Sequence, residues 1–284
     1  MTKVLVTGAG GFMGKPLIKA LLAEGVEVIP LGREQGDLAH ATTWERISKA
    51  DALIHLAGRS YVPDSWRDQI GFIQGNVVAT GHALDYCRSH GARLIFVSAY
   101  VYGIPSRLPI REDDPVRPNN PYALSKRMAE ELCAFYAEYC EVPVTVLRVF
   151  NVYGPGQRAE FLIPEIIRQI RTGREIRVKD LSPKRDYIYI DDVVGAMVKA
   201  LAVPGKFNLL NIGSGKSLSV REIIDRIQRV SGTTLPIHSD SMERPQEIPD
   251  VRADISRARK MLKWQPNYDF SAGIQAIMNM EERS

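Results

Sequence analysis

Short apolar runs recur along the chain, and amphipathic stretches separate them. These runs are Val4–Val6, Val26–Ile29, Ala52–Leu56, Leu94–Val97, Val144–Leu147 and Phe207–Ile212. Runs of this length that are rich in branched residues are typical of strands covered on both faces. Pro16–Glu24 has a helical pattern, with Gly25 at its C-terminal end. Because strands alternate with helices, the sequence predicts an α/β fold with a doubly wound parallel sheet and right-handed crossovers.

The pattern changes after residue 153, where loop-rich segments appear. These segments are Gly154–Gly156, Leu181–Lys184 and Glu243–Pro249. Clusters of proline, glycine and polar residues of this kind mark turns and loops. We therefore expect two interleaved units. The larger comprises residues 1–153 plus 187–212, and the smaller, C-terminal subdomain comprises residues 154–186 plus 213–284.

The composition is that of an ordinary globular protein, with 45% hydrophobic and 25% charged residues. No window approaches the roughly 18 consecutive apolar residues of a membrane span, so we expect no membrane partner. The N-terminus has no basic segment followed by an apolar core, so we expect no signal peptide and a cytoplasmic location. The net charge of +4, without a basic run, gives no indication of nucleic-acid binding.

Cysteines and histidines give no indication of a disulfide framework or a metal centre. The three cysteines, Cys87, Cys133 and Cys140, are sparse and odd in number, so we expect buried thiols. The five histidines show no ligand spacing with cysteines or carboxylates. No metal is therefore expected.

A glycine-rich loop follows the first apolar run and opens the first helix. Gly8, Gly11 and Gly14 fit a G-x-x-G-x-x-G pattern, and Phe12 and Met13 lie within it. Glycines here let the backbone turn tightly and approach a pyrophosphate, which the unpaired N–H groups of the helix N-terminus attract. At this place between a strand and a helix, the pattern predicts a dinucleotide-binding domain of the Rossmann type.

The end of the second apolar run bears on the choice of dinucleotide. An acid there binds the ribose 2′-hydroxyl of NAD, whereas a nearby arginine accommodates the 2′-phosphate of NADP. Gly32 stands where we expect the acid, and Arg33 follows it. The sequence therefore favours NADP(H), with NAD(H) as the alternative if Glu34 or Asp37 binds the ribose. Alternatively, Asp37 faces the adenine, and we also expect a cofactor contact from its neighbour Leu38.

Tyr122 and Lys126 lie four residues apart in a segment that reads as a helix, so they share one face. A free phenol has a pKa of about 10, and a neighbouring ammonium group favours the phenolate. Lowering that pKa to about 7 takes roughly 4 kcal/mol, which is more than one exposed ion pair supplies. We expect Lys126 and a cationic nicotinamide together to supply it in a partly dry cleft. The result is a proton donor or acceptor matched to neutral pH.

With the glycine loop and this pair, the sequence resembles the short-chain dehydrogenase/reductase superfamily. Further motifs resemble its extended branch, the nucleotide-sugar epimerase/dehydratase family. In the family's order they are His55–Gly58, Asn76–Thr80, Val97–Gly103, Arg148–Gly156, Arg185–Asp192 and Asn211–Gly215. The resemblance covers nearly the whole chain. It implies an NAD(P)-dependent enzyme whose smaller subdomain binds a nucleotide-diphosphate sugar.

The resemblance also implies roles for single residues. Ser98 would hydrogen-bond the sugar oxygen that gains or loses a proton and place it against Tyr122, while Lys126 would also hold the nicotinamide ribose. Further cofactor contacts are implied for Leu56, Ala57, Gly58 and Asn76. Substrate contacts are implied for Ser60 and, at the diphosphate, for Asn151, Arg185 and Arg244, because an arginine fork suits phosphate.

Departures from the family pattern narrow the reaction. Sugar 4,6-dehydratases carry an acid soon after the catalytic Ser or Thr, but Ala99 and Tyr100 follow Ser98 here. Related 4-epimerases often carry Lys where this chain has Ser60, and Ser60–Trp66 is more similar to enzymes of 6-deoxy or 4-keto hexoses. We therefore expect a 4-ketoreductase of a nucleotide-activated 4-keto-6-deoxyhexose. A nucleotide-sugar 4-epimerase with tightly held NAD is the alternative, and a non-catalytic NADP-sensing protein is a distant third.

Two expected helices bear on assembly. Tyr122–Tyr139 and the segment around Val77–Arg88 carry more apolar surface than one buried face requires. In the family such helices pair in a four-helix dimer core. We therefore expect a homodimer.

One further segment is similar to a kinase-type P-loop. It is Gly213–Ser217, but the P-loop motif requires a glycine where Leu210 stands. We expect a loop and a helix start there instead. Ser219 and Glu222 have the spacing of a capping box, in which each side chain pairs with a free backbone N–H group.

Overall fold

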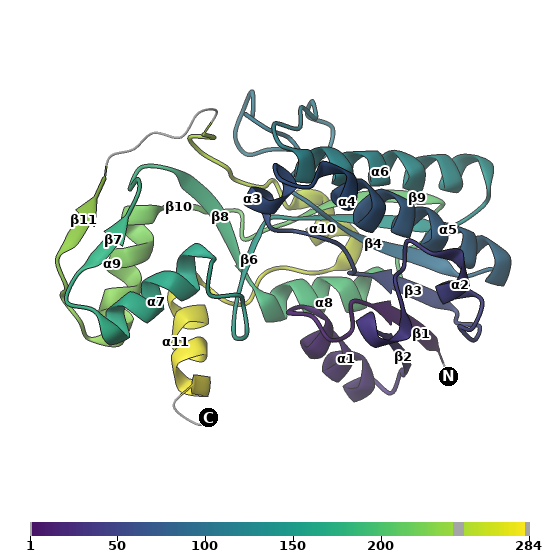
Figure 1. Ribbon diagram of the computed structural model, residues 1–284, viewed down its shortest axis with the longest axis horizontal. Helices are drawn as coiled ribbons and strands as arrows, with labels where there is room; N and C mark the ends of the chain where they lie inside the picture. The colour runs from purple at the N-terminus through teal and green to yellow at the C-terminus, as the bar shows by residue number, and fades with distance from the viewer. Residues whose placement is uncertain (1, 241–246, 282–284) are drawn as a thin grey trace.

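The chain folds around a six-stranded parallel sheet (Figure 1). The computed structural model describes residues 2–240 and 247–281. In spatial order the strands are β2 (Glu27–Leu31), β1 (Lys3–Thr7), β3 (Ala52–His55), β4 (Arg93–Ala99), β5 (Val144–Val149) and β9 (Phe207–Ile212). Every neighbouring pair is parallel. The strands confirm the six apolar runs, and the sheet confirms the predicted α/β class.

The sheet has a topological switch point between β1 and β3. From β1 the chain adds β2 on one side and then returns to add β3 and the later strands on the other side. At such a point the connections diverge and leave a crevice outside the carboxyl ends of the strands, where α/β proteins bind ligands. The glycine loop after β1 and the Leu56–Gly58 loop after β3 both begin there.

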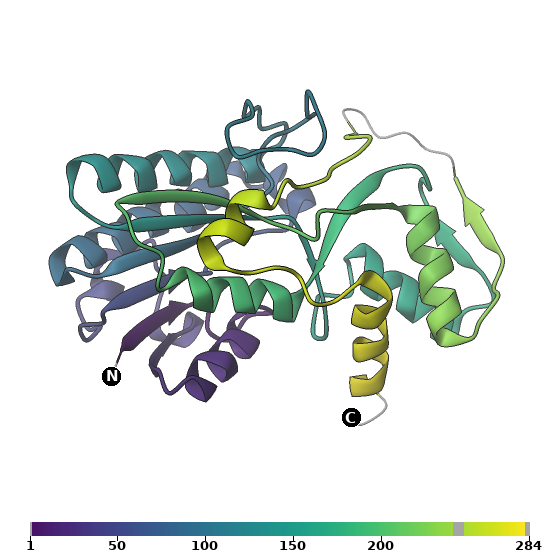
Figure 2. The same ribbon diagram turned by 180° about the vertical axis from the view of Figure 1, so that it is seen from behind.

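Helices cover both faces of the sheet (Figures 1 and 2). On one face lie α1 (Gly14–Ala23) and α8 (Ile190–Ala200), and on the other α5 (Ala79–His90) and α6 (Pro121–Tyr139). Shorter turns join them, namely η1 (Arg33–Gln35), α2 (Ala41–Trp44), α3 (Val62–Ser65), α4 (Gln69–Ile73) and the π-helical η2 (Gln74–Val78). Along β4 the side chains alternate, so that Phe96 packs with α5 and α6 while Val97 packs with α1 and α8. This alternation makes two cores, one on each face.

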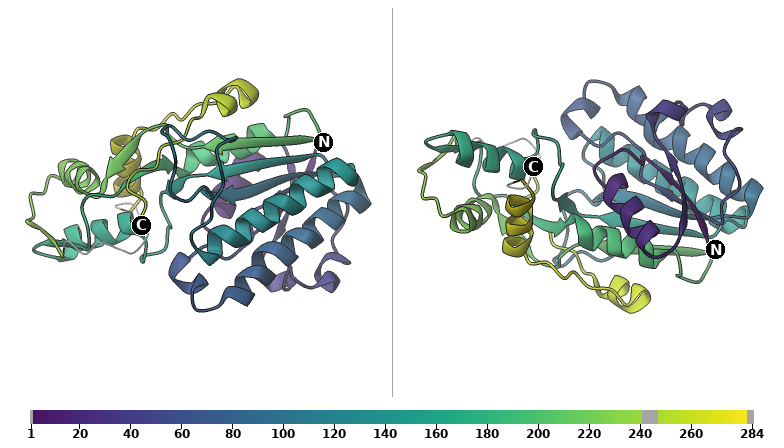
Figure 3. Two further views of the ribbon diagram at one scale, coloured as in Figure 1. Left: turned by 90° about the horizontal axis from the view of Figure 1, so that it is seen from above. Right: turned by 90° about the horizontal axis from the view of Figure 1, so that it is seen from below.

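A smaller lobe lies beside the sheet (Figure 3). Its strands are β6 (Asn151–Tyr153), β8 (Lys184–Tyr189) and β10 (Ser217–Ser219) in one sheet, and β7 (Ile176–Val178) with β11 (Ile237–Ser239) in another. Its helices are α7 (Leu162–Thr172), α9 (Val220–Ser231) and α11 (Phe270–Glu281), while α10 (Ser256–Leu262) lies beside β9. The Ser219 hydroxyl accepts the N–H of Glu222 at 3.1 Å, and the Glu222 carboxylate accepts that of Ser219 at 2.8 Å. The predicted capping box is confirmed.

A buried carboxylate on β8 ties the smaller lobe together. Asp186 accepts hydrogen bonds from the N–H groups of Ser214 at 2.7 Å, Gly215 at 3.0 Å and Ala253 at 3.0 Å. The N–H groups that a P-loop would offer to phosphate are therefore bound by the protein itself, as expected for a segment that is no phosphate loop. The strand β8 crosses the expected boundary between residues 186 and 187, and the division of the chain into two units stays a prediction.

Candidate active site

The glycine loop runs from the end of β1 into α1. Gly8 has a φ of +69°, which side chains with a Cβ rarely adopt, and its carbonyl oxygen accepts the N–H of Gly11 at 2.9 Å. A Cβ on Gly14 would collide with the carbonyl oxygen of Gly8. The first turn of α1 therefore packs on the loop only because residue 14 is glycine. These features fit a dinucleotide, whose pyrophosphate the three glycines, Phe12 and Met13 would border.

The loop after β3 packs directly against the glycine loop. A Cβ on Gly8 would lie 3.0 Å from the backbone nitrogen of Ala57. The Thr7 hydroxyl oxygen accepts the N–H of Ala57 at 3.2 Å and is hydrogen-bonded to Nδ1 of His55 at 2.7 Å. Burial lowers the pKa of His55 to about 3, with a smaller effect from the charge of Lys126, so the ring is neutral near pH 7. The structure thus brings the predicted residues Leu56, Ala57 and Gly58 beside the glycines.

Asn76 lies in the π-helical turn η2 and is buried. Its Oδ1 accepts the N–H of Arg59 at 2.7 Å, and its Nδ2 donates to the Arg59 carbonyl at 3.0 Å and to the Ser125 hydroxyl at 2.8 Å. The side chain therefore fastens the loop after β3 to α6. Such π-helical turns occur frequently at functional sites. In this structure the Asn76 amide group is hydrogen-bonded within the protein. The cofactor contact expected of Asn76 stays a prediction.

Gly32 stands where the acid of an NAD enzyme was expected. The position that a side chain on Gly32 would take is occupied by a carboxylate from another residue. A Cβ on Gly32 would lie 2.5 Å from both carboxylate oxygens of Glu34. Arg33 is exposed in the same short helix, η1. Arg33 and Glu34, two of the three residues considered for the adenine ribose, thus lie at the end of β2, and they favour different dinucleotides.

The next turn, at Asp37 and Leu38, is braced by its own hydrogen bonds. The Asp37 carboxylate accepts the N–H of Ala39 at 2.9 Å, and the Leu38 carbonyl accepts the indole N–H of Trp44 at 3.0 Å. Asp37 is exposed and Leu38 is half-buried. Their expected place beside the adenine stays a prediction.

Tyr122 and Lys126 project from the first turns of α6. The side chain of Asn120 caps this helix by accepting an N–H of its first turn at 2.9 Å. The Lys126 ammonium group donates to the Val97 carbonyl at 2.7 Å, and its nitrogen lies 4.2 Å from the centre of the Phe96 ring. Both contacts are with β4, so the helix is held against the strand that also carries Ser98.

Burial shifts the pKa values of both members of this pair. Burial raises the pKa of Tyr122 above its usual value. Burial also lowers the pKa of Lys126 to about 8, an effect that the charge of Glu130 opposes. The lowered phenol pKa that we expect from Lys126 together with a cationic nicotinamide stays a prediction.

Ser98 lies near the carboxyl end of β4 and is buried. Its hydroxyl donates to Oε1 of Glu130 at 2.6 Å. Glu130 follows Lys126 by one turn of α6, and Arg148 on β5 pairs with it at 2.7 Å. Strand β4 and helix α6 thus gather the three expected catalytic residues, and the Ser98 hydroxyl faces an acid that sequence analysis missed. The available signal was Arg148 within an apolar run, because a buried arginine requires a counter-charge.

The residues expected at the substrate diphosphate lie in the smaller lobe. Asn151, on β6, donates to the Asp186 carbonyl at 3.1 Å. Arg185, on β8, donates to the Ile248 carbonyl at 2.6 Å and forms an ion pair with Glu247. Ser60 is exposed in the loop after β3, and Arg244 lies outside the described residues. The phosphate contacts expected of these residues stay predictions.

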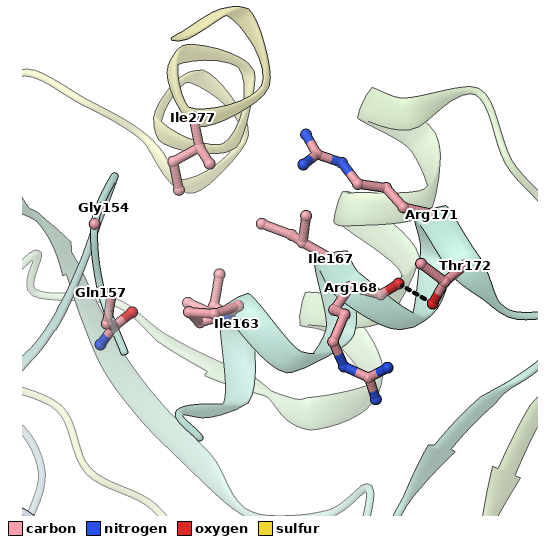
Figure 4. A pocket seen from close by; sticks show the side chains of 10 residues that line it. Gly154, Gln157, Ile163, Ile167, Arg168, Arg171, Thr172 and Ile277 are labelled. Carbon is pink, nitrogen blue, oxygen red and sulfur yellow. Dashed lines mark hydrogen bonds between the residues drawn. The ribbon is translucent and has the colours of Figure 1, made fainter. Parts of the chain in front are cut away.

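A separate pocket lies within the smaller lobe (Figure 4). Ile163 and Ile167 of α7 and Ile277 of α11 form its apolar wall, and Gln157 borders it from the loop after β6. Its volume of about 190 Å³ is below the roughly 300 Å³ of small-molecule sites. None of the predicted site residues lines it, so this pocket is separate from the candidate active site.

Residues 2–240 and 247–281 contain neither a candidate metal site nor a candidate membrane-spanning helix. No group of three or more His, Cys, Asp and Glu side chains there could hold a metal ion. No helix in the same ranges has the length and apolar character needed to cross a membrane.

Comparison with known proteins places this arrangement in a family. A model of the "NAD dependent epimerase/dehydratase family" matches residues 4–213. GDP-6-deoxy-D-mannose reductase from Pseudomonas aeruginosa is 31% identical, over 98% of this chain and 96% of that protein. UDP-glucose 4-epimerase from Azospirillum brasilense is 30% identical, over 99% of this chain and 92% of that protein.

Solved structures agree with the sequence relatives. The structure of RMD from Pseudomonas aeruginosa complexed with NADPH has a TM-score of 0.91 and 30% identity, and covers 100% of both chains. MoeE5 in complex with UDP-glucuronic acid and NAD has a TM-score of 0.91 and 30% identity, and covers 99% of both chains. The glycine loop, the Tyr122–Lys126 helix and these likenesses together show that the chain is an NAD(P)-dependent enzyme of nucleotide sugars and belongs to the NAD-dependent epimerase/dehydratase family.

Proposed function

We propose that the protein is an NADPH-dependent 4-ketoreductase of a nucleoside-diphosphate 4-keto-6-deoxyhexose. The observation that carries the proposal is the end of β2, where Arg33 is exposed beside a residue, Gly32, that has no acidic side chain of its own. An exposed arginine at this place accommodates the 2′-phosphate of NADP. Ala99 and Tyr100 after Ser98 also lack the acid of a dehydratase. The likeness over its full length to an NADPH-bound reductase supports the same function.

Each residue of the site has a defined task in this reaction. Tyr122 donates its phenolic proton to the C4 oxygen as that oxygen becomes negatively charged. Lys126, one turn further along α6, provides the positive charge that balances the resulting phenolate. Ser98 hydrogen-bonds the same C4 oxygen and fixes its position. NADPH, when bound, supplies the hydride to C4.

A nucleotide-sugar 4-epimerase is the second candidate, and one observation favours it. The Glu34 carboxylate lies over Gly32, where it is placed to accept the ribose 2′-hydroxyl of NAD. An epimerase oxidises C4 and returns the hydride to the opposite face of the sugar, so it must retain its dinucleotide between the two steps. Ser98, Tyr122 and Lys126 serve both reactions.

Identification of the dinucleotide that the purified protein releases on denaturation separates the two candidates. A reductase exchanges its cofactor in each turnover, so we expect little bound dinucleotide and tighter binding of added NADPH than of NADH. Near-stoichiometric NAD in the released fraction would contradict the reductase and support the epimerase. The same result would contradict the expected contact of Arg33 with a 2′-phosphate.

We also propose a homodimer formed through α6. Four of its apolar side chains are exposed at helical spacing, namely Leu124, Met128, Phe135 and Tyr139. Exposed apolar side chains gathered on one helix face are a feature of interaction surfaces. Light scattering is expected to give about twice the chain mass of 31.7 kDa, and Phe135→Glu is expected to give the monomer. A monomeric wild-type protein would contradict the proposal.

A further inference from the structure

A buried ion pair lies directly behind the expected catalytic residues. Arg148 on β5 donates to Oε2 of Glu130 at 2.7 Å through Nη2, and its Nε contacts both carboxylate oxygens at 3.0 and 3.2 Å. The two side chains are 1% and 3% exposed. Replacing such a pair by apolar residues is often neutral for stability, because removing two charges from water is costly. Stability alone is therefore a weak explanation for the pair.

The carboxylate of Glu130 has one neutral partner, the hydroxyl of Ser98. The two oxygens lie 2.6 Å apart, within the short range of hydrogen bonds to ionised acceptors. A serine hydroxyl has one proton and two lone pairs. With Glu130 as the acceptor, the contact selects the side-chain rotamer of Ser98 and so fixes the position of its Oγ.

Arg148 keeps the carboxylate in place independently of Ser98. Its guanidinium group is itself fixed, since Nη1 donates to the Glu112 carbonyl at 3.3 Å and the group lies 4.7 Å from the centre of the Tyr102 ring. Arg127, on the helix of Glu130, adds a more distant charge at 3.5 Å. Glu130 therefore keeps several hydrogen-bond donors when the O–H group of Ser98 turns towards the sugar. Rotation about the Cβ–Oγ bond can redirect the O–H group of Ser98, as a hydrogen-bond donor, to a sugar oxygen without movement of Oγ.

We propose that Glu130 is a positioning residue for catalysis: held by Arg148, it fixes the Ser98 hydroxyl at the point where the C4 oxygen of the sugar is bound. This inference rests on the proposed function, because it gives Ser98 a sugar oxygen to bind. Glu130 acts through Ser98 and has no contact of its own with the reacting atoms. The same arrangement serves a reductase and an epimerase, because both use Ser98 in the same way.

The experiment compares two double variants that differ in one hydrogen-bond acceptor. Arg148→Met is combined with Glu130→Gln in the first and with Glu130→Leu in the second, so that both lose the two buried charges together. Glutamine retains a carbonyl oxygen for the Ser98 hydroxyl, whereas leucine has none. Thermal unfolding identifies the temperature range in which both variants are folded.

We expect the leucine variant to show the lower kcat of the two. A misplaced catalytic group costs on the order of 100-fold in rate, and Glu130→Leu with Arg148→Met is expected to lose about tenfold relative to the glutamine variant, at a similar KM. Equal kcat values in the two variants would overturn the proposal. In a Ser98→Ala background the same exchange of glutamine for leucine is expected to leave kcat unchanged, and a further loss there would also overturn it.

A readout that needs no substrate separates this inference from the proposed function. Crystal structures are expected to show Ser98 in its wild-type rotamer in the glutamine variant and in a different rotamer in the leucine variant. If the wild-type enzyme turns over no nucleotide sugar, the proposed function fails, and an unchanged rotamer in the leucine variant still overturns the inference. If neither double variant folds, the single variant Glu130→Asp is used instead. Its side chain is one methylene shorter, so the carboxylate lies farther from the Ser98 hydroxyl while the charge is kept. An unchanged Ser98 rotamer in that variant would overturn the inference as well.

Discussion

Replacement of Gly14 by alanine tests the geometry of the glycine loop. The added Cβ would lie 2.5 Å from the carbonyl oxygen and 2.8 Å from the carbonyl carbon of Ala9, and it would overlap the carbonyl oxygen of Gly8. All of these are backbone atoms, so the loop or the helix must shift. Inserting a group of this size into packed structure costs about 1–3 kcal/mol. A loop that relaxes to relieve the strain loses the shape that fits a pyrophosphate, so dinucleotide affinity is expected to fall about 5- to 150-fold.

The assay is calorimetric titration of NADPH and NADH into the folded variant. Gly10→Ala is the matched control, because a Cβ at that position of the same loop would meet no atom within 4 Å. We expect the control to bind with affinity close to that of the wild type. Circular dichroism shows whether both variants are folded. A folded Gly14→Ala variant with wild-type affinity would refute the assignment of this loop to the dinucleotide.

Three further predictions concern catalysis and cofactor choice. Tyr122→Phe removes the proton donor, so kcat is expected to fall about 10²- to 10⁴-fold while dinucleotide binding is retained. Near-normal turnover in this variant would contradict the role of Tyr122. Retained biological function without turnover would favour the non-catalytic NADP-sensing protein. Burial lowers the pKa of Lys126 from 10.5 to about 8, so its ammonium charge is present below that pH and is lost above it. The pH profile of kcat is therefore expected to decline above pH 8, and a profile that stays flat to about pH 10, as for an unperturbed lysine, would contradict this. Arg33→Ala is expected to weaken NADPH binding about tenfold or more relative to NADH, and Glu34→Ala is expected to shift the preference towards NADPH. The preference is measured as kcat/KM with each cofactor. No change in either variant would exclude both residues from the ribose site.

The four inner strands β1, β3, β4 and β5 could be predicted because a strand buried on both faces leaves an apolar run, whereas the edge strands β2 and β9 are partly exposed. Val144–Leu147 is such a run, and it forms the first four residues of β5. The strands β7, β10 and β11 have three residues each, too few for any periodicity to appear in the sequence. The loop and helix start expected after Gly213 therefore contain a short strand before the confirmed capping box.

The candidate site could be predicted where spacing along the chain determines it. The glycines need only a strand before them and a helix after them, and Tyr122 and Lys126 need only one helix. The hydrogen-bond partners of these site residues depend on which strand packs against which helix. The local sequence does not determine that packing. The Val97 carbonyl that binds Lys126 and the Glu130 carboxylate that binds Ser98 are contacts of this kind.

The central claim is the reduction of a 4-keto sugar by NADPH, and direct measurement of that reaction tests it best. NADPH oxidation is followed by absorbance with nucleoside-diphosphate 4-keto-6-deoxyhexoses that carry different bases, and the product is identified by NMR. The account predicts one NADPH consumed for each C4 hydroxyl formed, with no reaction in Tyr122→Phe. Interconversion of UDP-glucose and UDP-galactose without added cofactor, together with no NADPH consumption on the keto sugars, would contradict it.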